Sequence, residues 1–201
     1  MRNLLPVLVI ALIIGTASVA LSADAARLDT PGAAKSMICT GCHGPAGNSL
    51  GDTIPIIAGM APNYFKKTIK DYSEGKRPSP EMEPFSKYVM QAGLDEIAGY
   101  FAEQKRQPPR SKIDANQAKR GAKIAAQCAA CHGPQGNGDA ERGYPALRGQ
   151  PIGYLQLQSV LFKENKRKLE EATVEDTKNK MMKSLSDSDI AELAAYFASL
   201  K

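Results

Sequence analysis

One phrase occurs twice in the sequence, and it constrains the chain more than any other feature. Residues 39–48 read CTGCHGPAGN, and residues 128–137 read CAACHGPQGN. Both copies have the form Cys-x-x-Cys-His-Gly-Pro-x-Gly-Asn. They contain all four cysteines and both histidines of the chain. Any fold for this chain must therefore bring two thiols and one imidazole together in two separate places.

The similarity of the two copies extends over most of the chain. Matched residues follow each phrase at the same offset: Pro55 and Pro145, Gly59 and Gly149, Tyr64 and Tyr154, and the pairs Lys76-Arg77 and Lys166-Arg167. Each half also ends alike, in LDEIAGYFAEQ and in SDIAELAAYFASL. Similarity that repeats at one offset over a whole half indicates a duplicated domain.

A polar segment with two prolines separates the two copies. It reads QKRQPPRSK, residues 104–112. Proline lacks an N–H group and clashes with the preceding helical turn, so we do not expect a helix here. We therefore expect a first domain over residues 26–105, a linker over residues 106–112 and a second domain over residues 113–201.

Both domains are expected to be all-α. A first helix leads into each cysteine pair, and it begins near Asp29-Thr30-Pro31 in the first domain and at Asp114 or Asn116 in the second. A second helix follows Tyr64 and Tyr154. The last helix of the second domain begins at Ser186, with Asp189 three residues on as a weak capping box. The last helices share an apolar face: Leu94, Ile97, Ala98 and Phe101 in the first domain, and Ile190, Leu193, Ala194, Phe197 and Leu200 in the second.

The N-terminal residues are typical of a secretory signal peptide. Arg2 precedes a short apolar run, and the small residues SADAA follow it. Cleavage after Ala25 fits best, and cleavage after Ser22 or Ala23 is the alternative. The run from Leu4 to Leu21 is also long enough for an uncleaved membrane anchor. In either case the folded part, which we take as residues 26–201, is exported.

The charge of the chain is mildly basic and unevenly divided. The formal net charge is +5, of which residues 26–107 contribute +1 and residues 108–201 contribute +4. So small an excess, without a basic run interleaved with aromatic residues, does not predict nucleic-acid binding. Lys163, Lys166, Arg167 and Lys168 gather in one short segment. They form either a solvated helix face or a cationic rim for an acidic partner.

The Cys-x-x-Cys-His motif is the attachment site of a c-type haem. We expect Cys39 and Cys42 to bind one haem covalently, and Cys128 and Cys131 to bind a second. His43 and His132 follow directly, and each would bind its iron from the proximal side. Export agrees with this interpretation, because such a haem is usually attached outside the cytoplasm.

Three other uses of paired cysteines fit less well. Two disulfides would suit an exported chain but would leave both histidines unexplained. A zinc site usually has its second cysteine pair some fifteen to twenty residues from the first, whereas these pairs lie roughly ninety residues apart. A thioredoxin-like motif needs a βαβ unit, which a helical chain lacks.

The chain resembles the class I dihaem cytochromes c, of the two-domain type called c-four. The two motifs, the Gly-Pro-x-Gly-Asn after each and the closing AGYF and AAYF segments carry this resemblance, which covers nearly all of residues 26–201. It implies two small all-helical domains, each folded around one haem, and a role in electron transfer. The same fold serves as the cytochrome subunit of flavocytochrome c sulfide dehydrogenases.

Methionine is the remaining candidate for the distal iron ligand, because no third histidine and no spare cysteine exists. Ligation by His and Met raises the potential of a haem. In the first domain, Met37 lies in the helix that carries the motif, and Met60 follows the motif closely. Met82 lies in EMEPFSKY, where we expect an extended loop, and the resembled family has its distal methionine in such a loop. We therefore expect Met82 to bind iron and assign its rival, Met90, to the core.

In the second domain only Met181 and Met182 are available, in NKMMKSLSD. We expect Met181 to bind iron because it lies further from the start of the last helix, with Met182 as second choice. The other methionine would then pack in the core. The resemblance also implies that the carbonyls of Pro55 and Pro145 orient the proximal histidines, although both could be plain turn prolines.

The leading functional hypothesis is an exported carrier that passes electrons between redox proteins through two haems. The alternative is the cytochrome subunit of a sulfide-oxidising complex, with a flavoprotein as partner. Association with a membrane oxidase is compatible with either. A catalytic haem protein is the third candidate, and it would need an open coordination position on the iron.

Overall fold

The computed structural model describes residues 30–201, and within this range the chain is helical without a β-strand. A bridge between Asp139 and Tyr144 is the one isolated β-bridge in this part of the chain. The predicted all-α fold class is therefore confirmed. The predicted signal peptide, residues 1–25, lies outside the described residues.

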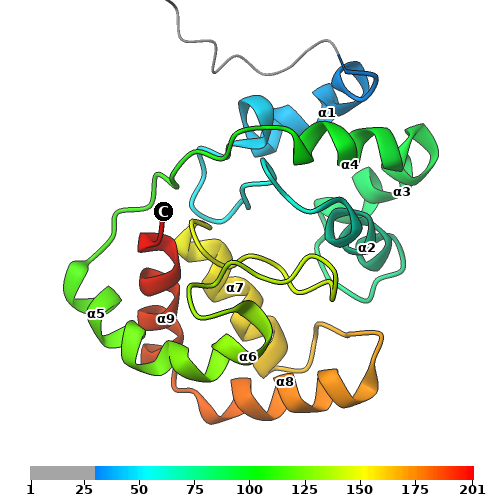
Figure 1. Cartoon of the computed structure of the whole chain (residues 1–201). Coiled ribbons are helices and arrows are strands. Elements are labelled where there is room, and N and C mark those ends of the chain that lie inside the picture. Colours follow the sequence, from blue (N-terminus) through cyan, green and yellow to red (C-terminus); the bar gives the residue numbers. More distant parts are fainter. Residues whose placement is uncertain (1–29) are drawn as a thin grey trace, which may run out of the picture.

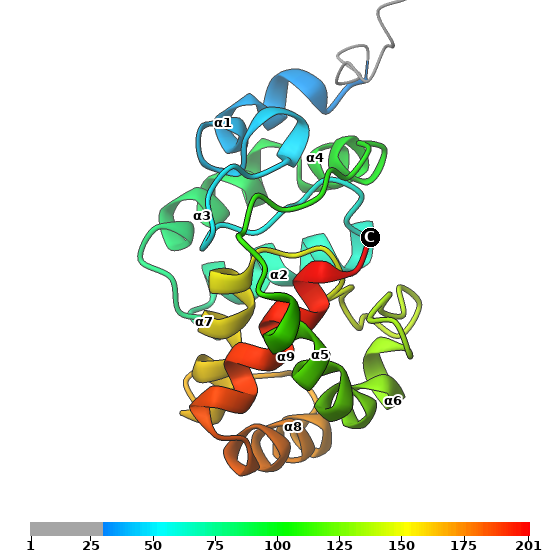
Figure 2. The same cartoon turned by 90° about the vertical axis from the view of Figure 1, so that its left-hand side faces the viewer.

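The helices form two groups, which lie one above the other in Figure 1 and again in Figure 2. The first group is α1 (Ala33–His43), the 3₁₀ turn η1 (Pro45–Gly47), α2 (Pro62–Ser73), α3 (Met82–Ala92) and α4 (Leu94–Ala102). The second group is α5 (Ala115–Ile124), η2 (Ala125–Cys128), α6 (Ala129–His132), α7 (Ile152–Lys163), α8 (Ala172–Ser184) and α9 (Asp187–Ser199). We call residues 30–105 the first half and residues 113–201 the second half.

Two of the three predicted helix starts are found as expected. The Asp114 carboxylate accepts hydrogen bonds from the backbone N–H groups of Asn116 and Gln117 and so caps α5. Ser186 and Asp189 form a complete capping box at α9. In contrast, α1 begins only at Ala33, behind a turn at Pro31 and Gly32. Thr30 contributes its carbonyl to that turn and makes no side-chain cap, so the helix begins two residues after the predicted Pro31, and Asp29 lies outside the described residues.

Each half closes where its first helix crosses its last helix over a glycine. A Cβ on Gly32 would lie 2.0 Å from the carbonyl oxygen of Glu96 in α4, and a Cβ on Gly121 would lie 2.0 Å from that of Glu192 in α9. Any side chain would therefore push the two helices apart. Both glycines stand seven residues before the first cysteine of their motif. The crossing thus places each motif at the same point of its half.

Each half also has its own hydrophobic core. The first core is made of Ala33, Ile57, Phe65, Ile69, Val89, Ile97, Ala98, Tyr100 and Phe101. The second is made of Ala125, Leu155, Phe162, Met182, Leu185, Ile190, Leu193, Ala194, Phe197 and Ala198. The predicted faces of the last helices supply the centre of both cores. In the described residues, no helix is long and apolar enough to cross a membrane.

Backbone contacts hold the two halves together beside a linker without helix. Arg106 donates from Nη1 to the carbonyl of Arg148, at 2.8 Å, and from Nε to that of Ala58, at 3.3 Å. Asp52 of the first half accepts from the N–H groups of Gly153 and Tyr154, at 3.1 and 2.9 Å. Asp52 therefore sits at the start of α7, where free N–H groups need partners.

Candidate functional site

Each Cys-x-x-Cys-His motif ends a helix with a buried histidine. His43 is the last residue of α1 and His132 the last of α6, and both are 8 % exposed. The glycine after each has a positive φ, 75° at Gly44 and 74° at Gly133, which favours glycine. The chain therefore turns away at once and leaves the imidazole facing the interior.

Both imidazoles are held by the proline carbonyls that the sequence suggested. Nδ1 of His43 lies 2.9 Å from the carbonyl oxygen of Pro55, and Nδ1 of His132 lies 2.9 Å from that of Pro145. A carbonyl only accepts, so Nδ1 carries the proton and Nε2 keeps its lone pair. This orientation presents Nε2 to a metal in both halves.

The titration of these groups agrees with a metal-binding role. Burial lowers the pKa of His43, against the effect of the Pro55 carbonyl. Burial and the nearby Lys178 ammonium lower the pKa of His132 to about 4. Both rings are thus neutral at pH 7, the form that binds iron. Burial also raises the pKa of Cys39 to about 11 and that of Cys128. All four cysteines are free of disulfides.

An apolar cavity of about 600 Å³ opens in front of the first motif. Cys39, Cys42 and His43 line one side of it. Its apolar walls include Ile57, Phe65, Ile69 and Val89. This volume lies within the range of ~300–1,000 Å³ that is usual for cofactor sites.

The methionines of the first half divide into two at the cavity and two outside it. Met82 and Met60 both line the cavity. Met82 does not lie in an extended loop as expected, because it is the first residue of an additional helix, α3. Met90 is 42 % exposed, so its assignment to the core is wrong: it lies on the solvent side of α3. Met37 is 59 % exposed on α1.

The second half supplies part of the wall of this cavity. Tyr154, Leu157, Gln158 and Leu161 of α7 line it. Two arginines, both almost fully buried, cross between the halves here. Arg77 donates from Nη2 to the hydroxyl of Tyr154 at 2.7 Å, and Arg167 donates from Nη2 to the hydroxyl of Tyr64 at 3.3 Å. The duplicated residues thus pair crosswise.

These two guanidinium groups suit an anionic ligand. Nε of Arg77 and Nε of Arg167 are buried without a hydrogen-bond partner, and neither side chain has a carboxylate within ion-pair distance in the part of the chain that the structure describes. Burial raises the pKa of Tyr64, but Arg167 and Arg77 outweigh it and hold that pKa at about 7. A buried charge without a counter-charge is costly. A haem has two carboxylates at one edge, so the residues present fit this group.

One buried contact links the second half to the proximal histidine of the first. The Gln150 side chain accepts from the N–H of Ile56, at 2.9 Å, and donates to its carbonyl, at 2.8 Å. Ile56 directly follows Pro55, which orients His43. Gln150 matches Met60 in the repeat, and a methionine cannot make this pair of hydrogen bonds. Through this contact the second half supports the loop beside His43, and Met60, at the matched position of the first half, cannot support the loop beside His132 in the same way.

On the distal side of the second half, α8 takes the place of α3. Met182 is 5 % exposed and packs in the core, whereas Met181 is half-buried. The same helix brings Lys178 inward, with its ammonium nitrogen 5.2 Å from the ring centre of Phe162. The structure thus places three side chains of α8 on or near the inner side of the second half.

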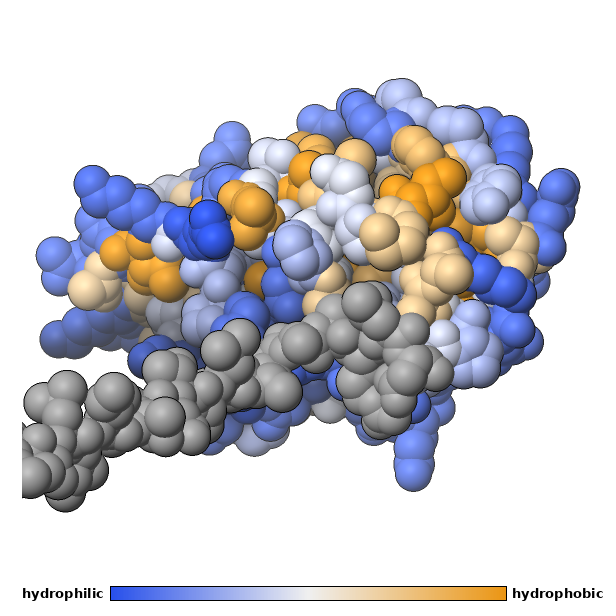
Figure 3. Space-filling model, turned by 90° about the horizontal axis from the view of Figure 1, so that it is seen from above, coloured by the Kyte–Doolittle hydropathy of each residue, from blue (hydrophilic) through white to orange (hydrophobic). Residues whose placement is uncertain are grey.

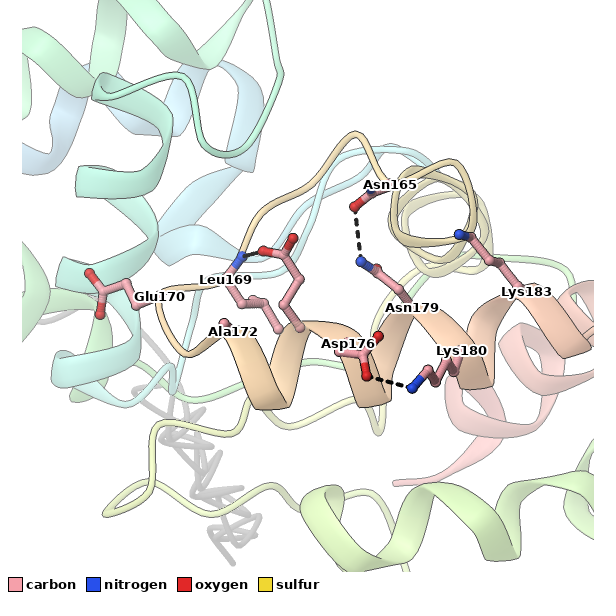
Figure 4. Close-up of a pocket in the computed structure, with 9 residues that line it drawn as sticks. Asn165, Leu169, Glu170, Ala172, Asp176, Asn179, Lys180 and Lys183 are labelled. Atoms are coloured by element: carbon pink, nitrogen blue, oxygen red, sulfur yellow. Dashed lines mark hydrogen bonds and ion pairs between the residues drawn. The ribbon is translucent and has the colours of Figure 1, made fainter.

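The outer side of α8 is polar (Figure 4). It borders a hollow of about 420 Å³ lined mostly by charged and amide side chains. Asn179 donates to Asn165 at 2.9 Å, and Lys180 pairs with Asp176 at 2.6 Å. The Asn179–Asn165 bond ties α8 to the loop before it, whereas the Lys180–Asp176 pair lies within the helix.

The basic segment 163–168 is not an exposed cationic rim throughout. Arg167 is 6 % exposed and belongs to the interface between the halves. Lys163, Lys166 and Lys168 pair with Asp187, Glu164 and Glu175, respectively. Exposed apolar side chains lie instead at the first cavity, where Ile38, Phe85 and Leu157 are each more than 40 % exposed. Figure 3 shows hydrophobic residues gathered among charged ones on one face of the molecule.

Comparison with known proteins agrees with this geometry. The family model for cytochrome c matches residues 118–201. Cytochrome c4 of Pseudomonas aeruginosa is 35 % identical to the chain, over 89 % of the chain and 91 % of that protein. The chain belongs to the cytochrome c4 family.

Two further relatives extend the comparison. The crystal structure of reduced recombinant cytochrome c4 from Pseudomonas stutzeri has a TM-score of 0.75 and 30 % identity, and covers 84 % of this chain and 96 % of that one. A thiosulfate dehydrogenase electron acceptor of Stutzerimonas stutzeri is 29 % identical, over 89 % of this chain and 87 % of that protein. The chain is thus a dihaem cytochrome with two covalently bound haem c groups, and it carries electrons rather than catalysing a reaction.

Sequence reasoning missed two residues beside the first cavity, Arg77 and Gln150. The signal for Arg77 was present, since an arginine recurs at the same offset in both halves. Gln150 gave no signal, because its partner is a backbone group far away in the sequence.

Proposed function

We propose that this cytochrome is exported to the periplasm and shuttles electrons between redox proteins there. The observation that carries the proposal is the first cavity, where the thiols of Cys39 and Cys42, the imidazole of His43 and the thioether of Met82 face one apolar space. Cys128, Cys131 and His132 repeat the proximal arrangement in the second half.

In this proposal His43 and Met82 are the residues that would hold the iron of the first haem. Met60 also reaches the cavity, but it belongs to the loop that holds His43 through Pro55. Met82 comes from another element, α3, and so approaches from elsewhere. A thioether ligand raises the haem potential, which suits a protein that accepts electrons.

The protein groups around the haems hold and connect them. Pro55 and Pro145 fix the proximal rings, so their ligating nitrogens need not reorient. Arg77 and Arg167 supply the positive charge for the haem carboxylates at the boundary between the halves. Since α7 of the second half lines the first cavity, electrons have a short path from one half to the other. When bound, the haem iron takes up and gives back one electron.

Export is supported by the signal-like segment 1–25 and by the haem-attachment motifs. For the donor, the similarity to a thiosulfate dehydrogenase electron acceptor favours an enzyme that oxidises an inorganic sulfur compound. The alternative donor is a flavoprotein subunit that oxidises sulfide. Copurification of a flavin-containing chain would favour this alternative.

Mass spectrometry of the exported protein tests the proposal. We expect the mature chain plus two haems, each bound through one cysteine pair. A chain without haem and with two disulfides would overturn it. For the distal ligand, Met82→Ala should lower the potential of the first haem, and Met90→Ala is the matched control on the solvent side of the same helix. The reverse pattern would exclude Met82.

A further inference from the structure

Counting back from the last helix of each half identifies the residue of the second half that corresponds to Met82. Tyr100-Phe101 and Tyr196-Phe197 are the matched aromatic pairs of α4 and α9. Met82 lies eighteen residues before Tyr100, and Lys178 lies eighteen residues before Tyr196. In this register Lys178, and not Met181 or Met182, stands where the first half has its expected distal ligand.

Burial supports this register at other positions. Val89 and Leu185 correspond and are 2 % and 6 % exposed, and Ser86 and Met182 correspond and are 0 % and 5 % exposed. Met181 corresponds to Phe85, which is 42 % exposed. Met182 therefore takes a core position and Met181 a position at the rim.

The structure brings the Lys178 amine to the core that lies beside the second haem-attachment motif. Its nitrogen lies over the ring of Phe162, which belongs to the second core, and Cys128 packs against that core. Burial lowers the pKa of its own amine below the ordinary value. In the described residues, no carboxylate pairs with it.

The neighbours of Lys178 on α8 have other roles. Asn179 and Lys180 contact Asn165 and Asp176 on the polar side of the helix (Figure 4). Lys183 lines the same polar hollow. Of the lysines of α8, Lys178 is the one that approaches the motif, so its position is not a general property of a basic helix.

We propose that Lys178 is the distal iron ligand of the second haem, in place of Met181 or Met182. As a neutral amine it would offer its nitrogen lone pair to the iron, and the proton that it held as ammonium would pass to solvent. An amine lacks the effect by which a thioether raises the haem potential. We therefore expect the second haem to have a lower reduction potential than the first. A protein that holds a single electron would then carry it mainly on the first haem. This inference depends on the proposed function only in that a haem is attached at Cys128 and Cys131.

Variants of Lys178 in the two-haem protein test the ligand. In the oxidised wild type we expect the far-red iron–methionine charge-transfer band to have the intensity of one methionine-bound haem out of two. Lys178→Ala should convert one of two low-spin ferric signals to high-spin in electron paramagnetic resonance. Lys178→Met should instead give a second far-red band and raise the lower potential. Lys180→Met, on the outer side of the same helix, should change none of these readouts.

Other results would overturn the assignment. Two far-red bands in the wild type would contradict it, as would the survival of both low-spin signals in Lys178→Ala. Loss of a band in Met181→Leu or Met182→Leu would restore the methionine as ligand. A protein with fewer than two haems by mass would instead count against the proposed function, so the two failures can be told apart.

Discussion

The two halves of this member of the cytochrome c4 family are alike around the motif histidine and differ in the segment that precedes the last helix. In both, a buried histidine ends a helix and bonds to a proline carbonyl at 2.9 Å. Opposite the histidine, the iron ligands that we propose differ: Met82 from the start of α3 in the first half, and Lys178 from the middle of α8 in the second. Haem attachment constrains the proximal side closely, whereas the distal side has room to diverge after duplication.

The contacts between the halves are also unequal. The Arg77–Tyr154 and Arg167–Tyr64 hydrogen bonds follow the repeat, because they join the same matched positions in both directions. Gln150 breaks it, because it supports the His43 loop and has no counterpart that supports the His132 loop. The second half therefore stabilises the first haem site more than the reverse.

The largest expected effect tests whether the halves have separate cores. Phe101 and Phe197 are 0 % and 5 % exposed, and each lies at the centre of its own core. We expect Phe101→Ala to destabilise the first half and Phe197→Ala the second, each by about 3–5 kcal/mol. Hydrogen exchange, followed by mass spectrometry of peptides from each half, would show which half opens. Equal loss of protection in both halves would mean that they share one folding unit.

A middle-sized effect tests the inequality between the halves. Gln150→Met introduces the residue of the matched position and leaves the buried N–H and carbonyl of Ile56 without partners. We expect a loss of about 2 kcal/mol, with faster hydrogen exchange around residues 54–58 and a shifted potential of the first haem only.

The matched control for Gln150 is Asn63→Ala. Asn63 also contacts the other half, at the carbonyl of Ala140, but on the exposed surface. We expect a loss within about 0.5 kcal/mol and unchanged potentials. A shift of both potentials in Gln150→Met would show that the contact serves the two haems alike.

The smallest effect concerns the last helices, which differ at their starts. Ser186 caps α9, whereas α4 begins behind Gly93 without a side-chain cap. We expect Ser186→Ala to cost the second half about 1 kcal/mol at pH 7. The Ser186 hydroxyl and N–H lower the pKa of Asp189 below its ordinary 3.8. This contribution is present above that pH and is lost as the pH falls through the lower folded value.

Urea unfolding of the second half at two pH values measures the effect of this cap. The difference between wild type and Ser186→Ala should shrink in acid. A difference that stays constant down to the lowest accessible pH would mean that the Asp189 carboxylate takes no part in the cap.

The sequence predicted the features that depend on local pattern. The duplication, the helical class, the caps at Asp114 and Ser186 and the proximal histidines all follow from spacing or from periodic apolar residues. Pro55 and Pro145 were suggested by their matched positions. Each of these depends on neighbours in the chain or on the repeat.

Features that depend on packing between distant segments were not predicted. The extra helix α3 and the exposure of Met90 depend on how that segment lies against α2 and α4. Among neighbouring lysines, Arg167 had the pattern of a surface charge. Its partner Tyr64 is far away in the sequence, so no local pattern indicates the contact.

Methyl NMR of the reduced protein with labelled methionines tests the central difference between the halves most directly. A methionine methyl group bound to reduced low-spin haem iron is shifted far upfield by the ring current of the macrocycle. We predict one such signal, and its disappearance in Met82→Ala. Two signals in the wild type would show that both haems bind methionine and would contradict the assignment of Lys178.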